Sequence, residues 1–300
     1  MIAIAQTLRT SVLLVIFFFP ALASDITGGS KTEALFWKVE SESATVYMLG
    51  SIHIAGDDLY PLPFHIENAF NKSGYLVVEV DITNIDQNEI LQLIAMHGQL
   101  ENGRTLSTVI PQSTYEAVKN EFSEYGINIL QFERVNPWVV AITLSQLQMM
   151  KFGFRPEYGV DLYFLSDARD EMEIIELETG ADQISIFSDL SMELQILLLE
   201  DFLYDLTLPR ERVHDLFEAY KRWDAAWIRD FIFESVGKHP ELQPLYEKLL
   251  DDRNVNMAEK IDSFLRNEGT YFVVVGAGHL FGEMGIIELL RKKGYTPVVP

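Results

Sequence analysis

Two short phrases, 226 positions apart, carry the same pattern. Residues 47–53 read Tyr-Met-Leu-Gly-Ser-Ile-His, and residues 273–279 read Val-Val-Val-Gly-Ala-Gly-His. In each phrase an apolar run too short for a helix reads as a strand, and it ends in a glycine that permits a sharp turn. A histidine, His53 or His279, follows just beyond the strand's carboxyl end, which is where open α/β sheets place their ligand sites. If the two halves of the chain pack as related units, the two imidazoles meet at one cleft.

The segments around the first phrase predict a strand, a helix and a second strand. Residues 35–39 and 45–49 read as paired strands, and a helix follows the prolines of the loop at 57–63. Residues 75–81 read as a buried strand that ends in acids. This order is typical of a βαβ unit.

The rest of the chain adds a long helical region and a second set of strands. Helical periodicity covers residues 82–169 and 181–265, and strands are expected at 173–178, at 271–275 and, after a closing helix over 286–293, at 296–299. The last three elements predict a second βαβ unit. We therefore predict a mixed α/β fold, in which two pseudo-symmetric, βαβ-containing halves form a shared sheet and cleft around a large helical middle region.

The first residues, 1–23, read as an export signal. Arg9 supplies a weak positive charge, residues 11–19 form an apolar run, and residues 21–23 are a small-x-small cleavage site. A membrane anchor is the alternative, but the apolar run is shorter than the roughly 20 residues that span a bilayer. We expect cleavage after Ala23 and a periplasmic or secreted protein.

The remaining residues, 24–300, are expected to form one domain, with a first half of about 32–170 and a second half of about 171–300. The absence of cysteine excludes thiolate metal ligands, thiol nucleophiles and disulfides. The formal net charge is −22, or −23 without Arg9, so the protein should repel nucleic acid. No later segment is apolar for long enough to span a membrane once the signal is removed.

Acidic residues accompany both histidines of the pattern. One predicted strand ends in Glu79 and Asp81, and another ends in Glu176 and Glu178. Imidazoles and carboxylates are ligands of borderline divalent metals, and a metal with an open position ionises bound water for attack on a carbonyl. Alternatively, Glu79 or Glu178 is the general base, or a histidine activates water without metal while a carboxylate orients it. The alternative is that Glu79 and Glu178 are helix N-caps or salt-bridge partners. Acids are costly to bury unpaired in such apolar strands, which favours a site role.

A further motif, Asp252-Arg253-Asn254, stands before a helix predicted over residues 257–265. It is either a surface helix entry with Asn254 as the N-cap, or a way to bring Arg253 into an acidic cleft. There the fork-shaped guanidinium would steady carboxylates or a developing oxyanion. The other histidines are expected to be structural or solvent-exposed: His65, His97, His214 and His239.

These motifs together resemble those of the TraB/GumN family, which is related to the Tiki proteases that cleave Wnt proteins and to the pheromone-shutdown proteins of bacteria. The similarity covers nearly the whole chain after the signal. The matching phrases are LGSIH at 49–53 with YPLP at 60–63, VVEVD at 77–81, EYGVD at 157–161, LET at 177–179 with Gln183, DRN at 252–254 and VGAGHL at 275–280 with Gly282.

The resemblance implies a two-half α/β fold in which His53, His279 and Glu79 form a metal-dependent hydrolytic site. Further site residues on the matching phrases are Gly50, Gly276, Asp161, Glu178 and Arg253. The wider superfamily resembles erythromycin esterases, which use similar histidines and a glutamate for hydrolysis that need not involve metal.

The expected function is therefore an exported hydrolase, a peptidase that uses Mn, Co or Zn on a peptide or protein substrate. Two alternatives stay open. One is a metal-independent, esterase-like hydrolase, and the other is a non-catalytic protein that holds a peptide or glycan in the same cleft.

Overall fold

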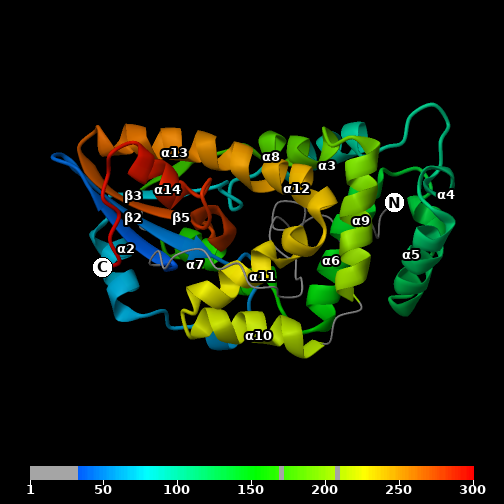
Figure 1. Cartoon of the computed structure of the whole chain (residues 1–300), viewed down its shortest axis with the longest axis horizontal. Helices are drawn as coiled ribbons and strands as arrows, with labels where there is room; N and C mark the ends of the chain where they lie inside the picture. Colours follow the sequence, from blue (N-terminus) through cyan, green and yellow to red (C-terminus); the bar gives the residue numbers. More distant parts are fainter. Residues whose placement is uncertain (1–32, 169–171, 207–209) are drawn as a thin grey trace.

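The computed structural model describes residues 33–168, 172–206 and 210–300, so the expected signal peptide lies outside the described residues. Five strands form one sheet in the order β1-β2-β5-β3-β4 (Figure 1). They are β1 (Phe36–Glu40), β2 (Ala44–Ser51), β3 (Tyr75–Val78), β4 (Glu173–Glu176) and β5 (Gly269–Gly276). Strand β1 pairs antiparallel with β2, and the other neighbours pair in parallel. The mixed α/β fold predicted from the sequence is confirmed.

Helices make up most of the remaining described chain. Those of the first part are α2 (Phe64–Lys72), α3 (Gln87–His97), α4 (Leu106–Val109), α5 (Gln112–Glu124), α6 (Pro137–Lys151) and α7 (Val160–Asp167). Those of the second part are α8 (Gly180–Ser188), α9 (Met192–Leu206), α10 (Arg210–Lys221), α11 (Ala225–Lys238), α12 (Gln243–Tyr246), the π-helical turn η6 (Glu247–Asp251), α13 (Asp252–Leu265) and α14 (Ile286–Lys292). Short 3₁₀ turns are η2 (Asp57–Leu59), η3 (Ile129–Phe132), η4 (Pro156–Tyr158), η5 (Pro240–Leu242) and η7 (Ala277–Leu280).

Strands β2 and β5 lie side by side in the middle of the sheet. Their register pairs Gly50 with Val275 and Ser51 with Gly276, so the two Gly-x-x-His phrases leave the sheet at the same edge. Strands β3 and β4 continue the sheet beyond β5. Strand β5 of the predicted second half therefore lies between β2 and β3 of the predicted first half, in one shared sheet.

The sheet is covered by helices on both faces. Strand β5 is buried on both sides, so successive residues contribute to opposite cores. Phe272 packs in one core with Phe70 of α2 and Phe164 of α7, and α10 and α11 add to that layer. Val273 belongs to the opposite core, with helices α13 and α14 over it. In Figure 1, α13 runs along the top of the sheet toward the helical part of the molecule.

A separate core organises the helices far from the sheet. It is built around the buried Trp138 of α6 and includes residues of α3, α5, α8, α9 and α12. Figure 1 shows this helical part at the opposite end from the sheet. The described residues of the region 181–265 contain no strand, as expected. Nowhere in the three described stretches does a helix combine the length and apolarity needed to cross a membrane.

The predicted closing strand over 296–299 is wrong. Only Val298 pairs, as an isolated antiparallel bridge with Lys38 of β1, so the chain does not finish a second parallel βαβ unit. The next hydrogen-bonding position on that side is Pro300, which has no N–H to donate. Strands β3 and β4 also end earlier than expected, although Glu178 N–H still donates to Glu79 C=O at 2.8 Å.

Candidate active site

The carboxyl edge of the sheet gathers four side chains from four neighbouring strands. His53 follows β2 and His279 follows β5, while Glu79 follows β3 and Glu178 follows β4. All four side chains are buried. The parallel pairing of these strands is the reason that residues so far apart in sequence meet at this edge.

Arg253 of α13 joins the two glutamates. Its Nη2 donates to Glu79 Oε2 at 2.6 Å and to Glu178 Oε2 at 2.7 Å, and its Nε donates to Glu178 Oε1 at 2.7 Å. Gln183 of α8 donates to both carboxylates at 3.3 Å. Arg253 thus lies buried between two carboxylates, which is the placement that the second interpretation of its motif expected.

The surface-entry interpretation of the same motif does not match. The π-helical turn η6 runs directly into α13, so Asn254 lies inside a continuous helix and is not an N-cap. Its side chain accepts a hydrogen bond from His279 Nδ1 at 2.5 Å instead.

His279 is held as a neutral imidazole. Because Asn254 Oδ1 is an acceptor, Nδ1 of His279 carries the proton and the lone pair is on Nε2. Burial, together with the positive charges of Arg253 and His53, holds the pKa of His279 well below its usual range. His279 Nε2 lies 3.6 Å from Glu79 Oε1.

His53 has the opposite electrostatic environment. Its Nδ1 lies 2.7 Å from Asp161 Oδ2, and Ser51 Oγ donates to the other oxygen of Asp161 at 2.9 Å. Burial alone would lower the pKa of His53, but the buried carboxylate of Asp161 outweighs it and raises the pKa to about 9. At neutral pH His53 is therefore an imidazolium ion, and the two histidines of the site differ in charge.

Asp161 reaches His53 because the loop after β2 packs closely against the start of α7. Val160 N–H donates to Ile52 C=O at 3.0 Å, at the start of α7. Gly159 lies directly against the backbone of His53, and a Cβ atom added there would come within 2.3 Å of the His53 carbonyl oxygen. Only glycine allows this close approach.

The two glycines of the repeated phrases have different local roles. Gly50 lies where the two turns approach, and a Cβ there would meet the Ala277 backbone at 3.0 Å. Its carbonyl accepts a hydrogen bond from Tyr220 of α10 at 2.7 Å. Gly276 donates its backbone N–H to Glu79 Oε1 at 2.7 Å. The second turn thus orients the carboxylate that faces His279.

The remaining expected acids do not join the site. Glu176 Oε1 accepts from the backbone N–H of Asp81 at 2.7 Å, and Asp81 itself caps the turn at Thr83. Of each acidic pair, only Glu79 and Glu178 turn toward Arg253. Glu178 and Arg253 also border an open cleft of about 790 Å³ between α8 and α13.

The expected metal ligands do not fit a three-ligand ion as they are arranged. Within the described part of the chain, no three His, Asp or Glu side chains form a group that could hold a metal. Glu79 has one oxygen committed to Arg253 and Gln183 and the other to Gly276 N–H. The carboxylate of Asp161 favours a proton on the His53 ring, and a metal at Nε2 would have to displace it.

The sequence singled out the histidines, the glutamates, Arg253 and Asp161, and it missed three polar side chains that contact this region. Gln183 was visible only as a member of a matching phrase, and Asn254 was expected as a helix N-cap. Tyr220 gave no signal, because a tyrosine in a helical region is ordinarily a core residue.

Comparison with known proteins places this chain in a family. The sequence model of the TraB/PrgY/gumN family matches residues 35–298. The chain is 27% identical over 248 residues to the uncharacterized protein YbaP of Escherichia coli (strain K12), covering 82% of this chain and 87% of YbaP. It is 23% identical over 284 residues to an uncharacterized protein of Treponema pallidum (strain Nichols), covering 88% and 82% of the two chains.

A protein named as an enzyme also matches. The chain is 23% identical over 302 residues to metalloprotease TIKI2 of Danio rerio, covering 83% of this chain and 57% of that protein. No solved structure gave a significant match.

Proposed function

The chain belongs to the TraB/PrgY/gumN family, and from that premise we propose that it is an exported, periplasmic or secreted hydrolase that cleaves peptide bonds. The observation that carries the proposal is the pairing of β2 with β5, which brings His53 and His279 to one sheet edge beside Glu79. Relatives named metalloproteases support the peptide bond as the target. The export signal is proposed from the sequence of residues 1–23.

The two histidines are suited to opposite steps of one hydrolysis. His279 is neutral and has its lone pair on Nε2, next to the Glu79 carboxylate, so it can take a proton from water. His53 is an imidazolium and can give a proton. Environments that push two titratable groups apart in this way are typical of acid and base pairs in hydrolases.

The reaction balances with these two groups. As the water oxygen bonds to the carbonyl carbon, a water proton passes to His279 Nε2. The C–N bond then breaks, and the leaving nitrogen takes the proton of His53 Nε2. Transfer of a proton from His279 to His53 restores the starting state. Glu79, fixed by Arg253 and the Gly276 N–H, orients the water and stabilises the imidazolium that forms on His279.

The first experiment asks whether the histidines carry turnover. Purified protein is incubated with a fluorogenic peptide library, alongside His53→Ala and His279→Ala. We expect each substitution to lower the rate by about 10²- to 10⁴-fold. The matched control is His65→Ala, at an exposed histidine outside the site, which should leave the rate unchanged. Unaltered turnover in both site variants, with folding intact by circular dichroism, would refute the proposal.

The second experiment concerns the metal, for which the sequence points to Mn, Co or Zn. Because the acid and base pair is complete without an ion, we expect hydrolysis to persist after chelation. A rate that is lost on chelation and restored by one of the three ions would contradict this route while leaving the hydrolase proposal in place.

A non-catalytic role is the second candidate, and the open cleft beside Glu178 and Arg253 favours it. Such a protein would bind peptides or glycans with no turnover in any condition. The same library, read by binding and by cleavage, separates the two functions.

A further inference from the structure

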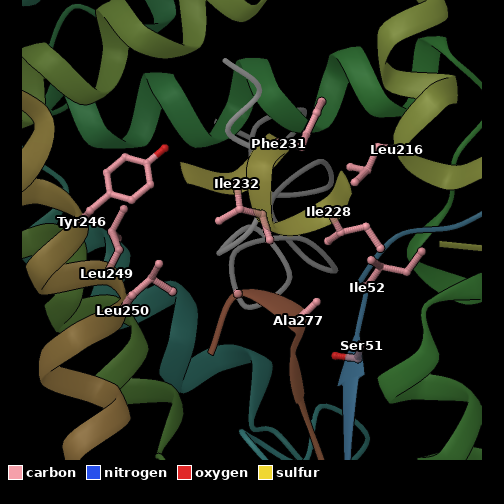
Figure 2. A pocket seen from close by; sticks show the side chains of 11 residues that line it. Ser51, Ile52, Leu216, Ile228, Phe231, Ile232, Tyr246, Leu249, Leu250 and Ala277 are labelled. Carbon is pink, nitrogen blue, oxygen red and sulfur yellow. The ribbon is translucent and has the colours of Figure 1, made fainter. Parts of the chain in front are cut away.

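An apolar pocket lies beside the two histidines and is used by no step described so far. Its floor is formed by Ser51 with Ile52 and by Ala277 with Gly278, the residues that directly precede His53 and His279. Figure 2 shows Ser51 and Ala277 at the base of this space. Any group in the pocket therefore lies next to the two turns that carry the acid and base pair.

Helix α11 and the turn η6 form most of the walls of the pocket, and Leu216 of α10 and Tyr246 of α12 complete them. Ile228, Phe231 and Ile232 lie on one face of α11, at the spacing that aligns side chains along a helix. Leu249 and Leu250 come from the π-helical turn η6 on the other side, as Figure 2 shows. Turn η6 continues into α13, so one helix supplies both this wall and the Arg253 and Asn254 side chains of the site. Single π-helical turns within helices are frequent at functional sites.

The chemistry of the lining selects an uncharged apolar group. Among the described residues that line the pocket, none has a charged side chain. Its polar side chains are those of Ser51, whose hydroxyl already donates to Asp161, and Tyr246. Burying a charged group there would leave it without a counter-charge. An apolar group loses only contact with water and gains contacts with the isoleucines and leucines of the walls.

The size of the pocket favours a small group. The cavity volume is about 30 Å³, and a single water needs about 10 to 15 Å³ of such volume, so the cavity has room for two to three waters. A compact branched aliphatic side chain, as in valine, leucine or isoleucine, needs less space than an aromatic ring.

We propose that this pocket holds a branched aliphatic side chain of the substrate, next to the peptide bond that is cleaved. This inference rests on the proposed function and narrows the substrate class to peptides with valine, leucine or isoleucine beside the cleaved bond. The occupant is one residue of a bound peptide.

The first test measures binding, so that it does not depend on turnover. Blocked tripeptides, acetyl-Gly-Xaa-Gly-amide with Xaa as Leu, Ala, Phe or Asp, are titrated onto the His279→Ala protein by ligand-observed NMR. We expect the leucine peptide to bind at least about tenfold more tightly than the alanine and aspartate peptides. In the same background, Ile232→Trp should fill the pocket and abolish that preference. Val236→Trp, one turn further along α11 and outside the lining, should not.

The second test measures cleavage and uses a gain of specificity that misfolding cannot imitate. Leu250→Ala removes three carbon atoms from the wall, so kcat/KM for a phenylalanine peptide should rise relative to a leucine peptide by about tenfold. Leu290→Ala, an equally buried leucine on α14 away from the pocket, should leave the ratio unchanged.

The two proposals fail in different ways. Leucine-selective binding that Ile232→Trp removes, with no cleavage of any peptide, would contradict the hydrolase and support the pocket. Cleavage without preference among Leu, Ala and Asp, unaffected by Ile232→Trp, would overturn the pocket and support the hydrolase. Equal binding of all four tripeptides would also overturn the pocket.

Discussion

At the scale of single residues, the charge of each histidine is decided by one partner atom. Asp161 offers a carboxylate to His53, and Asn254 offers a neutral amide oxygen to His279. Two imidazoles that follow the same Gly-x-x-His phrase therefore differ in protonation because of residues that belong to other parts of the chain. This difference is what makes one histidine an acid and the other a base.

Asn254 is accordingly a positioning residue. We expect Asn254→Ala to lower kcat by about 10- to 100-fold with little change in KM. Without the Asn254 acceptor, the hydrogen bond that fixes the proton of His279 on Nδ1 and holds the ring in its orientation is lost. Asn254→Asp keeps an acceptor oxygen but places a carboxylate beside His279, as Asp161 stands beside His53, so it should raise the pKa of His279 and lower the rate at neutral pH. The measurement is the pH profile of steady-state kinetics on a cleaved peptide. An acidic limb of that profile that does not move to higher pH in Asn254→Asp would contradict this role.

Gly159 determines whether Asp161 can reach His53 at all. Gly159→Ala places a Cβ against the His53 carbonyl and should destabilise the fold by about 1 to 3 kcal/mol while lowering activity. Gly74→Ala is the control, because an added Cβ there meets nothing within 4 Å. Urea unfolding and peptide cleavage are measured on both proteins. Full activity in Gly159→Ala would show that the two loops can separate without moving His53.

Sequence reasoning at this scale found residues that carry a recognisable pattern. His53 and His279 stand in a repeated phrase, and Glu79 stands in a strand where an acid is costly. The side chain of Asn254 could not be assigned, because its partner comes from the end of the chain, 25 residues on, and depends on how α13 lies on the sheet. Asn254 was expected to be an N-cap because the helix was predicted to start at residue 257, whereas α13 starts at Asp252 and continues from η6.

At the scale of elements, α13 is tied to the sheet by a buried ion triad. Its Arg253 bridges the strand ends that carry Glu79 and Glu178, and all three side chains are buried. A buried triad of this kind adds little net stability, yet removal of one member leaves the others uncompensated.

Arg253→Met should therefore destabilise the protein by about 3 to 5 kcal/mol, because two carboxylates lose their partner in a buried site. The matched control is Lys119→Met, which breaks an exposed ion pair with Glu116 and should cost less than about 1 kcal/mol. The free energy of unfolding in urea is compared for the two variants. Similar values would mean that water reaches the triad and solvates the glutamates.

The elements themselves were predictable where a local pattern is sufficient. The strands of both repeated phrases and helix α2 appear close to where the apolar pattern places them. The strand at 296–299 was predicted wrongly. Its apolar residues suit a strand, but a strand also needs a neighbouring strand whose backbone N–H and C=O groups are available for pairing. Here the neighbour is the edge strand β1, and only Val298 pairs with it.

At the scale of the whole molecule, the order of the strands decides the site. The sequence predicts two related halves but contains no signal for the placement of β5 between β2 and β3. That placement is a long-range pairing between residues more than 200 positions apart, and no local periodicity encodes it. The repeated Gly-x-x-His phrase supplied the expectation of a common site, the family resemblance supplied its hydrolytic role, and the register of β2 and β5 supplies the physical reason that the two turns meet.

The charge of the whole molecule has a consequence for stability. A formal net charge of −22 produces repulsion that the unfolded chain relieves by expanding. Salt screens this repulsion, because the Debye length falls from about 30 Å at 0.01 M to about 8 Å at 0.15 M ionic strength. Screening worth about 1 kcal/mol would raise the midpoint of thermal unfolding by about 2 to 4 °C for a chain of this size.

We therefore expect Tm to rise between 10 and 150 mM NaCl, as measured by differential scanning calorimetry at pH 7. KCl should give the same rise, since screening depends on ionic strength. Sucrose at matched osmolality adds no ions, so Tm should not follow sucrose concentration in the way that it follows salt concentration. A fall in Tm would mean that attractive surface pairs, such as Lys221 with Asp58, outweigh the repulsion among the excess acids. The buried triad at Arg253 is screened much less than surface charges, so Arg253→Met should keep the same salt dependence at a lower Tm.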